Sequence, residues 1–181
     1  VKPETKIDEN ASQVMVDGSE ICYNKYEYYM LNKPKGCISA TNDREHKTVI
    51  DIIKSSNKKD LFPVGRLDID TEGLLLITNN GELAHKLLSP KKHVEKKYYV
   101  EVQGILDEND AKLVQEGLDI GEEKLTLPAK MSNINTDEQN GVSSCFLTIH
   151  EGKFHQVKRM MKKLGKSVTY LKRVSMGSLV L

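Results

Sequence analysis

Four charged side chains lie close together in the segment GRLDIDTEG at residues 65–73. Arg66, Asp68, Asp70 and Glu72 occupy alternate positions, and an extended chain places alternate side chains on one face. A carboxylate held beside a guanidinium can act as a nucleophile or as a general base. Asp68 is the candidate for that role. The competing interpretation is a loop aspartate that caps the turn backbone, and the spacing alone leaves both open.

The same acids also match part of a calcium-binding loop. Asp68, Asp70, Glu72 and Gly73 fit positions 1, 3, 5 and 6 of an EF-hand, which need oxygen ligands and a turn glycine. Position 12 of that motif is a glutamate, but here it is Asn79. The flanking segments are typical of strands rather than helices. We therefore expect no metal at this loop.

A basic block occupies the C-terminal part of the chain. Eight Lys and Arg residues and no acid lie between Lys153 and Val174, although the whole chain has a net charge of only +1. Such a block indicates a surface for a polyanion, and the alternative is a solvated helix face. A second basic segment, Lys91–Lys97, precedes Tyr98. This arrangement suits a nucleic-acid base stacked on the ring, although Tyr98 could equally be a strand residue with a surface hydroxyl.

The elements that position these residues follow from hydrophobic patterning. Leu61–Val64 and Leu74–Ile77 are short apolar runs typical of strands, and the loop between them is expected to be a rigid platform. Further strands are predicted at 26–31, 98–102, 125–131, 143–150 and within 167–181, with a polar loop at 135–141 and a hairpin at 14–21. Helices are predicted at 80–88 (ended by Pro90), 107–117 and 154–164, and residues 48–53 are predicted to form a short helix or an apolar turn.

The predicted helix 154–164 has an apolar stripe with a cationic ridge beside it, formed by His155, Lys158, Arg159 and Lys162. Helices and strands are mixed without a strict βαβ rhythm, so we predict an α+β fold with a largely antiparallel sheet. No run of about 18 apolar residues indicates a membrane span. Three cysteines that lie far apart (Cys22, Cys37 and Cys145) argue against a disulfide framework and favour the reducing cytoplasm.

Four ordered segments of this chain together resemble one known family. Residues 33–36 (KPKG), 65–84 (GRLDIDTEGLLLITNNGELA), 95–98 (EKKY) and 151–160 (EGKFHQVKRM) are similar to motifs of the RsuA-type pseudouridine synthases, which modify ribosomal RNA. Four motifs in one order are a far more specific signal than any one of them. The similarity extends over residues 23–181. It implies the pseudouridine synthase fold, with a mixed, mostly antiparallel sheet, flanking helices and a central cleft.

The resemblance also implies an activity and a set of site residues. The activity is isomerisation of a flipped-out uridine to pseudouridine, with no cofactor and no metal. By this resemblance Asp68 is the essential carboxylate, Tyr98 stacks on the target uracil and Lys158 pairs with Asp68. Lys158 is often Arg in the family, and a lysine is a point charge rather than a fork, so its pairing should be looser. We expect RNA contacts from Arg66, Lys33, Lys35, Lys96, Lys97, His155, Gln156, Val157 and Arg159.

The same resemblance implies a domain organisation and a substrate. The chain does not begin with Met, and we expect residues 1–22 to be the tail of an S4-like RNA-binding domain and residues 23–181 to be the catalytic domain. Residues 121–130 and 174–177 look more like enzymes that modify 16S rRNA of the small subunit. We therefore expect a monomer that acts on 16S rRNA or on a pre-ribosomal small subunit. The alternatives are the same chemistry on 23S rRNA and a non-catalytic RNA-binding assembly factor.

Overall fold

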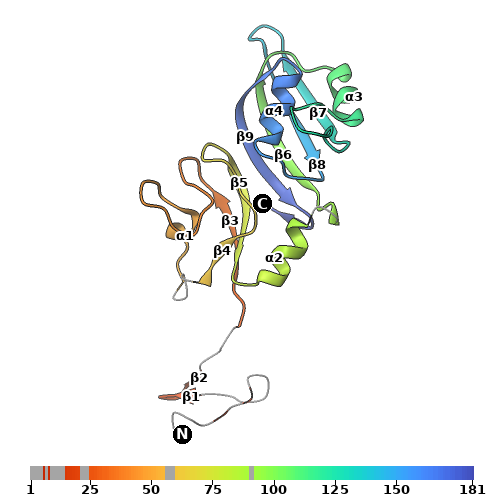
Figure 1. The fold of residues 1–181 in the computed structure, drawn as a ribbon. Helices are drawn as coiled ribbons and strands as arrows, with labels where there is room; N and C mark the ends of the chain where they lie inside the picture. The colour runs from red at the N-terminus through yellow and green to blue at the C-terminus, as the bar shows by residue number, and fades with distance from the viewer. Residues whose placement is uncertain (1–5, 7, 9–14, 21–24, 56–59, 90–91) are drawn as a thin grey trace.

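The computed structural model describes residues 6, 8, 15–20, 25–55, 60–89 and 92–181. They form one eight-stranded sheet in the order β3-β5-β9-β6-β8-β7, with β4 beside β5 and β10 beside β9 (Figure 1). Among its described strands, only β5 and β9 pair in parallel, so the α+β, largely antiparallel prediction is confirmed. The strands are β3 (Tyr28–Lys33), β4 (Phe62–Pro63), β5 (Glu72–Thr78), β6 (Lys96–Gln103), β7 (Lys130–Asp137), β8 (Val142–Ile149), β9 (Ser167–Met176) and β10 (Leu179–Val180).

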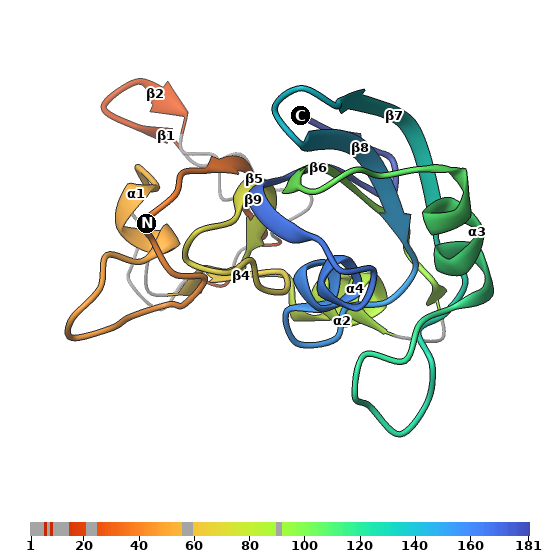
Figure 2. The ribbon, with the colours of Figure 1, turned by 90° about the horizontal axis from the view of Figure 1, so that it is seen from above.

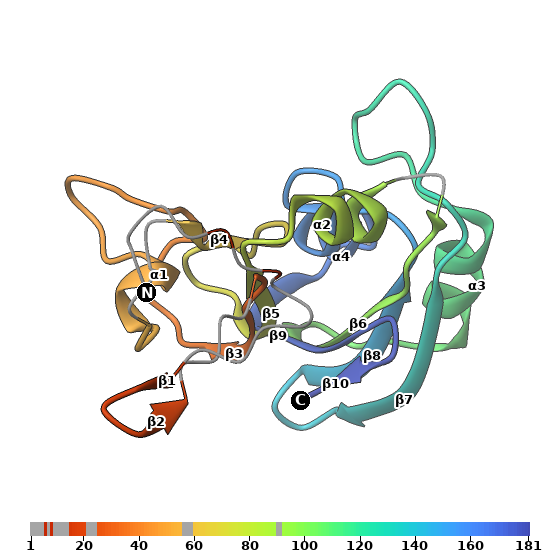
Figure 3. The ribbon, with the colours of Figure 1, turned by 90° about the horizontal axis from the view of Figure 1, so that it is seen from below.

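Four helices accompany the sheet at the predicted positions. They are α1 (Val49–Ile52), α2 (Gly81–Leu88), α3 (Glu108–Glu116) and α4 (Gln156–Lys163). Views along the sheet show α2 and α4 on the same side of it (Figures 2 and 3). Helix α4 packs against β9, and α3 packs against β7. Thr48 and Asp107 begin their helices with reciprocal capping boxes, which satisfy backbone N–H groups of the first turn.

The sheet has two halves that meet along a short line. The N-terminal half contains β3, β4, β5, α1 and α2, and the C-terminal half contains β6–β10, α3 and α4. They join where Glu72 and Gly73 of β5 pair with Lys172 and Arg173 of β9, whereas β6 and β9 pair over eight residue pairs. Gly73 has φ +102°, and a Cβ there would lie 2.2 Å from the carbonyl oxygen of Arg173. Only glycine allows this approach of the two strands.

One predicted strand is wrong. Residues 125–129 are not in a strand, because Leu125 points outward with 57% of its surface exposed and Pro128 interrupts the run. Strand β7 instead begins at Lys130 and continues to Asp137, through part of the predicted polar loop. This strand lies at the edge of the sheet, where only one neighbour pairs with it and polar side chains can face water.

A separate hairpin, β1 (Met15–Val16) and β2 (Ser19–Glu20), lies near the N-terminus and apart from the main sheet (Figure 1). Asp17 and Gly18 have φ +50° and +79°, the combination of a type I′ turn, as the sequence predicted. Four residues named in the sequence analysis lie outside the described residues. They are Val14 and Ile21 at the ends of the predicted hairpin, Cys22, and Pro90, which was predicted to end a helix. No helix in the described part of the chain is long and apolar enough to cross a membrane.

Candidate active site

The loop that carries Asp68, residues 65–71, is held from beneath by a buried lysine. Lys33 has no exposed surface, and its Nζ donates to the carbonyl oxygens of Pro34 (3.1 Å), Ile69 (3.4 Å) and Thr71 (2.8 Å). Burial lowers the pKa of Lys33 from the usual lysine value. Because a buried ammonium needs its hydrogen bonds, these carbonyl groups are fixed in place. Lys33 therefore positions the loop from inside the protein.

The loop buries the side chains of Leu67 and Thr71 and leaves those of Arg66, Ile69 and Asp70 exposed. Leu67 is buried, and its N–H and carbonyl both bond the Ser39 hydroxyl at 2.9 Å. Thr71 is also buried, and its N–H donates to the carbonyl of Asp68 at 3.1 Å, which closes a turn. Asp68 and Asp70 lie between these anchors and face the C-terminal half of the sheet. A loop with so many backbone anchors is a fixed support for its carboxylates.

The facing element is the start of α4. His155 precedes this helix in a left-handed conformation (φ +47°), and its side chain caps none of the described backbone. Its Nε2 lies instead 3.5 Å from Asp68 Oδ1. The buried side chain of Gln156 accepts from Lys153 N (2.9 Å) and donates to Glu151 (2.8 Å), which holds the turn before the helix. A non-glycine residue at positive φ is uncommon, and here it aims an imidazole at the carboxylate.

One turn further along α4, Lys158 connects the two halves. Its Nζ lies 3.0 Å from Asp68 Oδ2 and 2.6 Å from Asp70 Oδ1. Burial disfavours the charge of Lys158, but the hydrogen bonds that its ammonium donates to Asp70 and Asp68 outweigh this effect, so the pKa of this lysine is raised. The hydrogen bond from Lys158 is the main reason that the pKa of Asp70 is lowered. The ammonium is thus held as a cation between two carboxylates.

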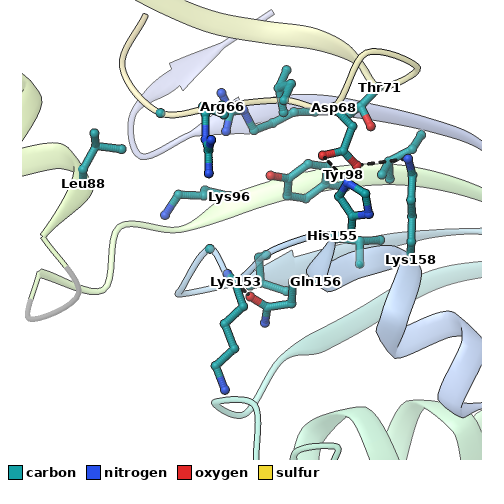
Figure 4. Close-up of a pocket in the computed structure, with 17 residues that line it drawn as sticks. Arg66, Asp68, Thr71, Leu88, Lys96, Tyr98, Lys153, His155, Gln156 and Lys158 are labelled. Carbon is teal, nitrogen blue, oxygen red and sulfur yellow. Dashed lines mark hydrogen bonds and ion pairs between the residues drawn. The ribbon is translucent and has the colours of Figure 1, made fainter. Parts of the chain in front are cut away.

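A pocket of about 130 Å³ opens beside this ion pair, and Arg66, Asp68, Tyr98, Val157 and Lys158 are among its lining residues. Figure 4 shows the Tyr98 ring between Asp68, His155 and Lys158 on one side and Arg66 and Lys96 on the other. Tyr98 is only 8% exposed and belongs to β6, so its ring is a fixed wall. The pocket therefore combines a carboxylate, a paired cation, an aromatic surface and further basic groups.

Most of the residues predicted for the site come together at this pocket. Arg66, Asp68, Lys96, Tyr98, His155, Gln156, Val157 and Lys158 all line it. Lys35 is exposed, and its charge contributes to lowering the pKa of Asp70, so it lies near the rim. The predicted pairing of Lys158 with Asp68 is present in the structure.

Four of the predicted RNA-contacting residues make their contacts within the protein. Lys33 is enclosed beneath the loop, which is incompatible with the direct contact we expected, and the amide of Gln156 is occupied within the protein. Lys97 lies over the Phe146 ring, 4.6 Å from its centre. Arg159 pairs with Glu122 and donates to the carbonyl of Ile120, away from the pocket. Lys33, Lys97 and Arg159 therefore have partners within the protein, and Gln156 lines the pocket with its amide already bonded. The four residues do not form part of the pocket's free basic surface.

Sequence reasoning missed two residues of the site. Asp70 is the nearer carboxylate partner of Lys158, and Arg173 lines the pocket from β9. The alternation of Asp68 and Asp70 offered a signal for the first, because it places both acids on one face. The signal for Arg173 was weaker, since it was only one of the eight basic residues in the C-terminal block.

The calcium interpretation has no geometric support. Glu72 lies in β5 and accepts a hydrogen bond from the Tyr170 hydroxyl at 2.8 Å, while Asp68 and Asp70 contact Lys158. No group of three or more potential ligands in the described ranges could hold a metal ion. A cation already occupies the space between the two aspartates that would face a metal.

Comparison with known proteins agrees with this geometry. The family model for RNA pseudouridylate synthases matches residues 27–163. The uncharacterized RNA pseudouridine synthase YtzG of Bacillus subtilis is 45% identical over 94% of this chain and 71% of its own length. Ribosomal large subunit pseudouridine synthase B of the same organism is 40% identical over 90% of this chain and 66% of its length. Ribosomal small subunit pseudouridine synthase A of Pseudomonas aeruginosa is 41% identical over 85% of this chain and 65% of its own length.

The chain thus spans about two thirds of the length of these relatives. A crystal structure of a pseudouridylate synthase superposes with a TM-score of 0.79 and 33% identity, covering 99% of this chain and 75% of the other. Human RNA pseudouridylate synthase domain containing 4 shares the fold alone, with a TM-score of 0.54 and 17% identity. The predicted fold and the resemblance are therefore confirmed, and the chain belongs to the RNA pseudouridylate synthase family of isomerases.

Proposed function

We propose that this protein converts a uridine of ribosomal RNA to pseudouridine, with Asp68 as the catalytic carboxylate. The observation that carries the proposal is the position of Asp68, which lies 3.0 Å from the Lys158 ammonium at a pocket walled by the buried Tyr98 ring. A uridine within an RNA helix is out of reach of this pocket, so the nucleotide must flip out at a cost of a few kcal/mol. Stacking on Tyr98 and contacts from the basic groups offset that cost.

In the reaction the N1–C1′ glycosidic bond breaks, the uracil rotates, and a C5–C1′ bond forms. The proton on C5 is lost, and N1 carries a proton in the product. Asp68 can act by attack at C1′ or by removal of a proton from the 2′ carbon. Lys158 stabilises the charged carboxylate in both routes, and Tyr98 and Val157 retain the detached uracil while it turns.

The preferred substrate in this proposal is 16S rRNA, either naked or in a pre-ribosomal small subunit. The similarity to small subunit synthase A supports it, while the nearly equal identity to large subunit synthase B makes 23S rRNA the alternative. We further propose that residues 23–181 are the catalytic domain of a cytoplasmic monomer. Residues 1–22 would then be the tail of an S4-like domain, which agrees with the family match beginning at residue 27.

Tritium release from RNA tests the proposed activity directly. 16S and 23S rRNA carrying 5-tritiated uridine are incubated separately with the wild-type protein, because loss of the C5 proton releases the label. We expect release from one rRNA only, and an Asp68→Asn variant that binds this RNA like wild type but is slower by at least about 10³-fold.

Asp119→Asn is the matched control, because it makes the same chemical change at an exposed acid that pairs with Lys163 outside the pocket. Its rate should equal that of wild type. Substantial release by Asp68→Asn contradicts the catalytic assignment. Tight rRNA binding without release by the wild-type protein supports the non-catalytic assembly factor instead.

A further inference from the structure

The pocket contains a group of cations without acidic partners. Arg66, Lys96 and Arg173 line it, and none of them lies within 4.0 Å of a carboxylate in the described part of the chain. Lys158, in contrast, contacts two carboxylates. Figure 4 shows Arg66 and Lys96 on the side of Tyr98 that is opposite to Lys158. One end of the pocket is thus charge-balanced, and the other carries an excess of positive charge.

Arg173 is the most unusual of these cations because it is almost entirely buried. It is 2% exposed, and its Nε donates to the carbonyl of Leu74 at 2.7 Å. Its Nη2 is also buried but has no hydrogen-bond partner among the described residues. An unpaired donor on a buried charged group costs considerable free energy. Such a group in a pocket indicates that a ligand completes its hydrogen bonds.

Lys96 lies on the same face of the sheet. It precedes Tyr98 by two residues in β6, and Tyr98 pairs across the strands with Arg173. The only described acceptor of Lys96 Nζ is the carbonyl of Val94, at 2.9 Å. Burial lowers the pKa of Lys96, and the like charge of Arg173 nearby lowers it further. A bound anion would relieve both the repulsion and the missing hydrogen bond.

We propose that Arg66, Lys96 and Arg173 form an anion site for a phosphodiester group that flanks the target uridine. The assignment rests on the proposed function, because a nucleotide stacked on Tyr98 with its sugar beside Asp68 extends its phosphates from that sugar. The cationic end lies across the Tyr98 ring from Asp68, within the same pocket. A guanidinium fork and an ammonium are the groups that proteins use for phosphate, and phosphate oxygens accept several hydrogen bonds at once.

Competition binding tests this site with two small probes. Labelled unmodified rRNA is bound to the Asp68→Asn protein, which cannot turn it over, and is displaced with uridine or with uridine 3′,5′-bisphosphate. We expect the bisphosphate to compete at least about tenfold better than the nucleoside, a difference of about 1.4 kcal/mol. In Lys96→Gln and Arg173→Lys proteins this preference should fall at least about threefold.

Lys112→Gln is the matched control, because it removes one exposed lysine from α3, outside the pocket, and should leave the preference unchanged. Thermal melting establishes that each variant is folded. If Arg173→Lys does not fold, Lys96→Gln decides the question, since its side chain is only partly buried. Equal competition by the two probes overturns the proposal, and so does a preference that the folded variants retain. Failure of the proposed function appears separately, as absent tritium release by the wild-type protein.

Discussion

The two halves of the sheet contribute different parts of one pocket. The N-terminal half carries Asp68 and Asp70 on a loop that the buried Lys33 holds from beneath. The C-terminal half supplies Lys158 from α4 and the Tyr98 ring from β6. Neither half holds a complete site by itself. The chemistry therefore depends on how the halves are joined as much as on the side chains that take part in it.

The strand pairing within the C-terminal half is also more extensive than the pairing that joins the two halves. Strand β6 pairs with both β8 and β9 over eight residue pairs each, whereas β5 meets β9 through two pairs only. The narrow junction begins at Glu72, directly after the Asp68 loop. A small displacement there would change the distance between Asp68 and Lys158.

The largest expected effect comes from adding a methyl group at the junction. Gly73→Ala should reduce the free energy of unfolding by at least about 3 kcal/mol, because Cβ would collide with the Arg173 backbone at a positive φ. Urea denaturation measures the loss. Gly81→Ala at the start of α2 is the control, since nothing lies within 4 Å of its new Cβ, and it should be neutral. Wild-type stability for Gly73→Ala would show that the junction is not tightly constrained.

Removal of the cation that connects the halves should have the next largest effect. Lys158→Met should lower kcat by about 10²-fold in the tritium-release assay, because Asp68 and Asp70 then face each other without a countercharge. Lys158→Arg should recover most of the rate, which a purely steric role would not allow. Lys162→Met removes an exposed lysine from the same helix and should leave kcat unchanged. Similar rates for Lys158→Met and wild type would contradict this role for the ion pair.

The aromatic wall of the C-terminal half comes third. Tyr98→Phe should retain nearly full activity, since the ring rather than the hydroxyl is proposed to hold the uracil. Tyr98→Ala should reduce kcat/KM by about 5- to 150-fold, from a stacking contribution of about 1–3 kcal/mol per base. Equal losses in the two variants would assign the role to the hydroxyl group.

The smallest effect concerns acid stability. The pKa of Asp70 is lowered chiefly by the hydrogen bond from Lys158, so the ionised form stabilises the fold above the unfolded pKa of about 4. That contribution is lost as the pH falls through the folded pKa. Asp70→Asn should therefore lower Tm slightly at pH 7, and at about pH 2 the variant and the wild-type protein should have the same Tm. Because the Asp70 side chain is half exposed, a large change in Tm at neutral pH would contradict a simple ion pair.

Local patterns predicted the fold well where the hydrophobic pattern of a segment is strong. The apolar stripe of α4, the capping residues of α3 and the buried run in β5 all gave correct elements. The strand predicted at residues 125–129 failed because Leu125 and Leu127 face solvent while Thr126 is buried, whereas the polar alternation of β7 suits an edge strand. Local sequence does not report which neighbour covers a segment.

For the site, the four motifs identified Asp68, Tyr98 and Lys158, which the structure brings to one pocket. The motifs did not distinguish cations that face the pocket from cations that have partners within the protein. Lys33, Lys97 and Arg159 look like surface charges in the sequence, yet each has a partner inside the fold. Arg173 looks like one more basic residue, yet its burial depends on the pairing of β9 with β5 and β6.

The connection between Asp70 and Lys158 spans 88 positions in the chain. During synthesis the acidic loop leaves the ribosome well before its cationic partner exists, and the repulsion between its carboxylates stays uncompensated until α4 is made. Contacts between residues so distant in the chain form late and slow the folding of a domain. The pocket should therefore be among the last parts of the molecule to become ordered, and a nascent chain that ends before α4 should lack the cation that pairs with Asp68.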